Sequence, residues 1–140
     1  MKEEGKLVRL QHDSDTSSYR IIRYLVTDLP AHQRRPGCSE SEILLAFPID
    51  DRNEPLITTQ NVYAFLPIRD YGFSFLIQAD FLLIASREEV DSSDWNRGLL
   101  QHIPNAFRRA VEAFNSGDLR YTWMLQSFHG WFRNCARCLL

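Results

Sequence analysis

The sequence predicts an α+β domain, in which a mostly antiparallel sheet of about four strands is packed by C-terminal helices. Two observations support this fold class. Up to about Leu83 the apolar residues form short runs or alternate with polar ones, as in strands, whereas after Asp91 they recur every three or four residues, as in helices. With 140 residues the chain can bury one core, so we assign residues 1–128 to a single domain and leave 129–140 as a tail of unassigned structure.

The N-terminal third predicts two strands separated by polar connections. Lys6–Gln11 alternates weakly and fits a short edge strand, and Tyr19–Thr27 favours a strand by its β-branched content, with a helix as the alternative. The run His12–Ser18 is typical of a turn or a mobile loop, so residues 1–18 are the expected mobile part. Pro, Gly and Ser make Pro30–Ser41 an expected loop.

The middle of the chain predicts the remaining strands. Glu42–Ile49 is a nearly continuous apolar run of strand length, and the turn-rich segment Asp50–Pro55 ends it. Asn61–Ile68 is the next expected strand, followed by a turn at Arg69–Gly72 in which the glycine can take a positive φ. The strand after this turn alternates, and one face is expected to be core: Phe73, Phe75, Ile77, Ala79 and Phe81.

A change of period marks the C-terminal helices. One apolar stripe at helical spacing consists of Trp95, Leu99, Ile103, Phe107, Val111 and Phe114. Asp91–Asp94 supplies N-cap candidates and early negative charge, and Asn115–Gly117 is a natural stop. Pro104 is expected to kink this helix or split it in two, and Asp118–Phe128 is expected to form a further short helix.

Composition and charge exclude several classes of function. With 16 basic and 18 acidic residues, the chain lacks the strongly basic balance of most nucleic-acid-binding domains. The longest apolar run, Phe81–Ala85, falls far short of the roughly 20 residues that a membrane span requires. The N-terminus has acidic residues where a signal peptide would have an apolar segment, so we expect a cytoplasmic or nuclear protein.

Recognisable catalytic and metal motifs are absent from the sequence. No histidine lies in a nucleophile motif, no glycine-rich phosphate loop is present, and the pairs Asp50–Asp51 and Glu88–Glu89 are expected to be solvated. Cys135 and Cys138 have the spacing of metal ligands, but His129 would be only a third ligand and zinc needs four. We therefore expect no catalytic residue, no metal site and no cofactor in the isolated chain.

Arginines are the remaining candidates for ligand contact. The pairs Arg34–Arg35 and Arg108–Arg109 are the notable positive clusters, and the second is expected on a solvated helix face. Arg87 follows an apolar strand directly, where a guanidinium could reach an anion such as phosphate in a bidentate manner. The alternative is an ordinary surface arginine paired with Glu88 or Glu89, which would contribute little to stability.

Several short blocks occur in the order seen in one known family. They are YAFLP at Tyr63–Pro67, YGFSFLIQADFLL at Tyr71–Leu83, SRE at Ser86–Glu88, WN at Trp95–Asn96 and IPNAF at Ile103–Phe107. Together they resemble the region that follows the ATPase domain in sacsin-like and NO VEIN-like proteins, whose ATPase belongs to the gyrase, heat-shock chaperone, histidine kinase and mismatch-repair superfamily. The resemblance covers roughly Glu42 to Trp123.

This resemblance implies a transducer segment of a chaperone-like ATPase. The acidic residue, the magnesium-binding asparagine and the glycine-rich lid of the nucleotide-binding core are not found, so the chain resembles a fragment, without the ATP-binding part. Several superfamily members use a basic residue after the core to reach the γ-phosphate, and Arg87 is the matching position. Ser86 would share the phosphate contact, Glu88 would orient Arg87, and buried Trp95 would hold the loop. ATP and magnesium would enter only if an ATPase core, the expected partner, were joined to this chain.

Two other interpretations remain open from the sequence. The chain could be a small module that binds another protein through a sheet edge or an aromatic surface, with no role for nucleotide. It could also be a nonfunctional remnant that does not fold alone because the second face of its sheet lacks a partner. The segment Gln126–Leu140 fits neither the family blocks nor a clear periodicity, and we assign it no function.

Overall fold

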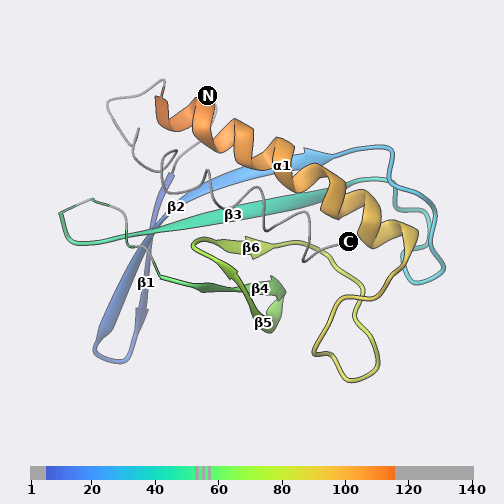
Figure 1. Cartoon of the computed structure of the whole chain (residues 1–140), viewed down its shortest axis with the longest axis horizontal. Helices are drawn as coiled ribbons and strands as arrows, with labels where there is room; N and C mark the ends of the chain where they lie inside the picture. The colour runs from blue at the N-terminus through green and yellow to red at the C-terminus, as the bar shows by residue number, and fades with distance from the viewer. Residues whose placement is uncertain (1–5, 53, 55, 57, 116–140) are drawn as a thin grey trace.

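A computed structural model describes residues 6–115 except 53, 55 and 57, and within them it contains one sheet and one helix. In Figure 1 the helix runs across β2 and β3. The elements are β1 (Lys6–His12), β2 (Asp15–Val26), β3 (Ser41–Ile49), β4 (Gln60–Ala64), β5 (Leu66–Phe73), β6 (Leu76–Gln78) and α1 (Asp94–Asn115).

The sheet has six strands in the order β1-β2-β3-β6-β4-β5. All neighbouring strands are antiparallel except β4 and β6, which are parallel. The prediction of a mostly antiparallel sheet of about four strands is therefore wrong, because the sheet is mixed and larger. After β5 the chain passes through Ser74 and Phe75 to the other side of β4, and this crossover produces the parallel pair.

The chain reverses at positions other than those the sequence suggested. The predicted turn Arg69–Gly72 lies within β5, and β4 instead reverses at Phe65, whose φ is 64°. Gly72 does have a positive φ of 86°, but it lies near a register shift in the ladder with β4 rather than in a hairpin turn. The run His12–Ser18 is also mostly strand, because the β1–β2 reversal is confined to Asp13 and Ser14.

One helix replaces the predicted pair in the part of the chain that the structure describes. α1 continues through Pro104, so the expected split does not occur there. Ser93 is the N-cap, since its Oγ accepts a hydrogen bond from the Asn96 N–H at 3.3 Å. Packing on both sides of Pro104 stabilises the helix more than one missing backbone hydrogen bond weakens it. The second helix, predicted at Asp118–Phe128, lies outside the described residues.

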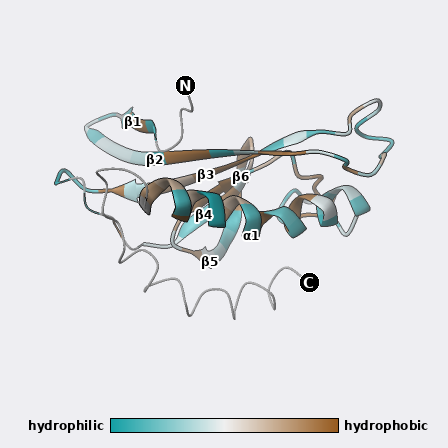
Figure 2. Cartoon of the chain, turned by 90° about the horizontal axis from the view of Figure 1, so that it is seen from above, coloured by the Kyte–Doolittle hydropathy of each residue, from teal (hydrophilic) through white to brown (hydrophobic). Residues whose placement is uncertain are grey.

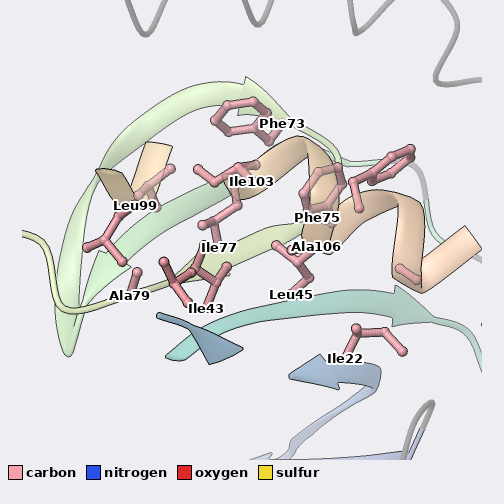
Figure 3. Packing of buried hydrophobic residues seen from close by; sticks show 14 of the residues in the cluster. Ile22, Ile43, Leu45, Phe73, Phe75, Ile77, Ala79, Leu99, Ile103 and Ala106 are labelled. Carbon is pink, nitrogen blue, oxygen red and sulfur yellow. The ribbon is translucent and has the colours of Figure 1, made fainter. Parts of the chain in front are cut away.

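The core lies between α1 and the sheet. Figure 3 shows Leu99, Ile103 and Ala106 of α1 facing residues of the strands. Both predicted apolar patterns are confirmed: the alternating face from Phe73 to Phe81 is buried, as is every member of the helical stripe except partly buried Val111. In Figure 2 α1 alternates between hydrophilic and hydrophobic colours, as expected of an amphipathic helix.

Aromatic rings fill the centre of this core. Phe47 of β3 lies 5.0 Å from Phe75 and 5.1 Å from Phe114, measured between ring centroids, and it is 1% exposed. Such ring pairs add to the stabilisation that burial itself provides. Phe47 therefore connects the sheet to the C-terminal half of α1.

We expect Phe47→Ala to lower the free energy of unfolding by about 3–5 kcal/mol, because it leaves a cavity among buried rings. Chemical denaturation of the purified chain measures this loss. Arg23→Ala is the control, since Arg23 of β2 forms only an exposed ion pair with Glu42 and its removal should cost about 1 kcal/mol or less. Equal losses for both variants would contradict the assignment of Phe47 to the core.

Candidate functional site

Three connections converge at one end of the sheet. β2 and β6 are both antiparallel to β3, and β4 is parallel to β6, so the C-terminal ends of β2, β4 and β6 lie at the same end. The loop 27–40, the reversal at Phe65 and the loop 79–93 follow these three strands, and α1 begins after the last of them. Figure 1 shows the end of β4 and the loop after β6 on the same side of the sheet.

These connections enclose an open cavity of about 570 Å³, which we call the Arg87 groove. Its lining carries three arginines and one aspartate, so it is positive although the whole chain has a net charge of −2. Volumes of this size are common for sites that bind small ligands. The lining residues are Arg34, Arg35, Ala64, Phe65, Asp80, Phe81, Leu83, Ile84, Ala85 and Arg87.

The charge of Arg35 is balanced by Asp80, which also lines the groove. Its Nε and Nη2 donate to the two carboxylate oxygens of Asp80, each at 2.5 Å, in a bidentate pair. The hydrogen bond with Asp80 is the main reason that the pKa of Arg35 is raised, and burial acts against it. Since this guanidinium is committed to Asp80, Arg35 connects the loop 27–40 to the segment after β6 and adds little free charge.

Arg34 retains more of its surface. Its Nη1 donates to the Leu83 carbonyl oxygen at 3.1 Å and lies 3.6 Å from Oδ2 of Asp91, while the side chain is 54% exposed. A guanidinium has five N–H donors, so these contacts leave several donors for other acceptors. Arg34 thus anchors the loop while more than half of its side-chain surface stays exposed.

Arg87 projects from a closed loop on the rim. The bridge between Leu83 and Val90 closes the loop, and Ile84 N–H donates to the Glu89 carbonyl oxygen at 3.1 Å. Arg87 has a φ of 61°, and its N–H donates to the Ile84 carbonyl oxygen at 2.9 Å. The backbone conformation of this residue is therefore defined although its side chain is exposed.

The guanidinium of Arg87 has no hydrogen bond or ion pair within residues 6–115. Glu89, one of its predicted partners, instead pairs with Arg69 of β5 at 2.7 Å. Glu88 is also exposed, and its N–H donates to Ser86 Oγ at 3.4 Å. The alternative of a surface arginine paired with either glutamate is thus not found, whereas the roles assigned to Ser86 and Glu88 stay predictions.

Two residues at the start of α1 hold the inner side of this loop. Trp95 is buried as predicted, and its Nε1 donates to the Asp80 carbonyl oxygen at 2.9 Å. Asn96 is fully buried; its Oδ1 accepts from Leu82 N–H at 2.8 Å, and its Nδ2 donates to the Leu82 carbonyl oxygen at 2.7 Å. Nδ2 also reaches Oδ1 of Asp91 at 2.8 Å, so one amide ties both sides of the loop to the helix.

Phe65 also lines the Arg87 groove. Its backbone N–H donates to Oε1 of Gln78 at 2.9 Å, and its side chain is 75% exposed. A positive φ is unusual for a bulky residue and costs free energy, so the surrounding structure has to hold it. The ring is consequently presented to solvent at the end of the sheet.

The sequence points to Arg87 but not to most of the residues that line the groove with it. It marks Arg34 and Arg35 only as a basic pair, and no motif in it singles out Asp80. Asn96 is the one residue whose sequence context hints at the anchoring of the loop. It lies beside Trp95 and three residues before Leu99, close to the apolar stripe, and a buried asparagine has to find hydrogen-bond partners.

The other candidates do not form a second site within the described residues. Among them no group of three or more His, Cys, Asp or Glu side chains could hold a metal ion. Arg108 pairs with Glu112 on an exposed face of α1, as expected. No helix in the described ranges has the length and apolar character needed to cross a bilayer. Cys135, Cys138 and His129 lie outside those ranges.

Comparison with known proteins finds one informative similarity. The chain is 39% identical over 93 residues to Protein NO VEIN of Arabidopsis thaliana, which covers 63% of this chain and 3% of that protein. The chain is therefore similar to a small part of a much larger relative. No protein-family model matches the sequence, and no solved structure matches it.

We expect Asn96→Ala to lower the free energy of unfolding by about 2–4 kcal/mol, because it leaves the buried polar groups of Leu82 without their side-chain partner. Asn105→Ala is the matched control, since Asn105 is an exposed asparagine of the same helix. Alanine favours helices, so this control should be neutral or slightly stabilising. Denaturation curves that shift equally for both variants would contradict the role of Asn96.

The pair Arg35–Asp80 should contribute more than a surface ion pair. A double-mutant cycle with alanine at both positions is expected to give a coupling free energy of about 1–3 kcal/mol, because the pair is bidentate and partly buried. The same cycle on Arg23 and Glu42 should give about 0.2–1 kcal/mol. Coupling no larger than in that exposed pair would show that Arg35 does not anchor the loop 27–40.

Proposed function

We propose that this chain is a non-catalytic, transducer-like domain that contacts a phosphate group through Arg87. In this proposal, the phosphate belongs to a nucleotide held with magnesium by a chaperone-like ATPase core that is not part of this sequence. The domain would couple the nucleotide state of that core to movement of neighbouring domains. The similarity to only 3% of Protein NO VEIN fits a domain that works together with other parts of a larger protein.

One observation carries the proposal: an exposed guanidinium without an ion pair in the described chain lies on the rim of a positive groove. Two nearby carboxylates are already paired, Asp80 with Arg35 and Glu89 with Arg69. Asp80 is the acidic residue of the lining, so a phosphate entering the groove would meet arginine donors and a carboxylate whose charge is already balanced.

The chemistry of arginine suits this role. A guanidinium offers two parallel N–H donors to two phosphate oxygens, and it stays charged at any physiological pH. Positive charge at the transferring phosphoryl group stabilises the transition state of phosphoryl transfer. The fixed backbone of Arg87 restricts where the side chain can reach, which reduces the entropy lost when a ligand is bound.

A protein-binding module is the second candidate, and one observation favours it. Three large apolar side chains near the groove are well exposed: Phe65 at 75%, Leu66 at 65% and Ile84 at 39%. Exposed apolar groups next to arginine are typical of protein interfaces. Both functions could use the same end of the sheet, but only the first requires a phosphate.

The first test is whether the purified chain binds tripolyphosphate, followed by calorimetry or by NMR titration. Arg87→Ala should weaken binding about tenfold or more, because charge-assisted hydrogen bonds contribute about 1.5–3 kcal/mol each. Arg87→Lys should restore part of the affinity, and Arg108→Ala on the exposed helix face should change nothing. Binding that Arg87→Ala leaves unchanged would refute the phosphate contact.

The non-catalytic part of the proposal has its own measurement. The isolated chain with magnesium and ATP should release no phosphate above the uncatalysed background, because the proposed contact of Arg87 supplies positive charge but no general base to activate a water molecule. Robust turnover abolished by Arg87→Ala would refute the non-enzymatic function and at the same time support the importance of Arg87.

A further inference from the structure

Two residues that line the Arg87 groove share an unusual backbone feature. Four residues other than glycine have a positive φ among those the structure describes, and two of them, Phe65 and Arg87, line this groove. Such conformations cost free energy and persist where the surrounding structure enforces them, and they are concentrated at ligand sites. The lining of the groove therefore contains two residues with a strained backbone, and the side chain of each is large and exposed.

Specific hydrogen bonds hold the backbone of each of these two residues in its positive-φ conformation. Gln78 of β6 accepts a hydrogen bond from the backbone N–H of Phe65, and the turn after Ile84 fixes the backbone of Arg87. Neither exposed side chain contributes to the hydrophobic core. Stability of the fold thus gives no reason for an aromatic ring and a free guanidinium at these two positions.

The two side chains offer complementary chemistry. Arg87 can bind phosphate oxygens, and the face of the Phe65 ring can stack on a planar group or cover an apolar one. The exposed side chain of Ile84, which also lines the groove, extends the apolar part of the wall. A free inorganic anion would use only the arginines and leave the apolar wall in contact with water.

We infer that the groove recognises a phosphate ester whose organic part is a planar or aromatic group, with Phe65 as the specificity-determining residue. This inference rests on the proposed phosphate contact and adds the class of ligand. The ring could come from a nucleotide base or from an aromatic side chain that bears the phosphate. Both sources share the same chemistry: an anion next to a flat apolar surface.

Two pairs of ligands test the inference, because each pair differs only in the organic group. ATP is compared with tripolyphosphate, and phenyl phosphate with inorganic phosphate, by titration of the full chain. The member with the ring should bind at least about fivefold more tightly in one pair or both, as expected when one aromatic side chain stacks on the bound group. Preference in the ATP pair alone indicates a nucleotide, and preference in the phenyl pair alone indicates a phosphorylated aromatic side chain.

Variants at Phe65 separate this inference from the proposed function. Phe65→Ala should abolish the preference for the ring without changing the affinity for tripolyphosphate, and Phe65→Tyr should preserve it. Phe65 is exposed, so neither change should unfold the chain, which thermal unfolding checks. Equal affinities within both pairs, or a preference that survives Phe65→Ala, would overturn the inference.

The same titrations on Arg87→Ala test the proposed phosphate contact separately. Loss of all binding in Arg87→Ala would still support the phosphate contact, and no effect of Arg87→Ala would refute the contact itself.

Discussion

The structure of the groove depends on one buried amide. Asn96 lies at the start of α1 and exchanges hydrogen bonds with the backbone of Leu82 while it also contacts Asp91. These two residues are the points where the loop leaves the core and returns to it. Because a buried amide is stable only when its polar atoms are paired, the helix and the loop have to adopt their positions together. Arg87 lies in the loop between these two residues.

The arginines around the groove differ in their ion pairs: Arg35 is paired and holds the structure together, whereas Arg87, within the described residues, is free to contact a ligand. Arg35 and Arg69 are each paired with a carboxylate, which ties the loop 27–40 and β5 to the segment after β6. Arg34 is partly engaged, and the side chain of Arg87 has no such partner within the described residues. The combination of strain, exposure and paired neighbours is what makes Arg87 a candidate for ligand binding rather than for stability.

Much of the core could be predicted from the sequence, because periodicity reports which face of an element is buried. The alternation from Phe73 to Phe81 and the stripe along α1 both hold, even though the predicted strand is interrupted at Ser74 and Phe75. Turns are harder to predict than buried faces. The sequence suggests a hairpin at Gly72 because glycine adopts a positive φ easily, whereas the chain reverses at Phe65, where the side chain of Gln78 stabilises a conformation that phenylalanine disfavours.

By itself, the sequence determined the α+β class, the buried faces, the position of α1 and the polar loop that carries Arg87. These are local properties, set by the spacing of apolar residues and by the residues that end each element. Only the tertiary structure decided the six-stranded mixed sheet, the parallel pairing of β4 with β6 and the meeting of Arg34, Phe65 and Arg87 at one groove. The physical reason is that strand order and ion pairs depend on contacts between residues far apart in the chain, such as Arg35 with Asp80, which no local pattern records.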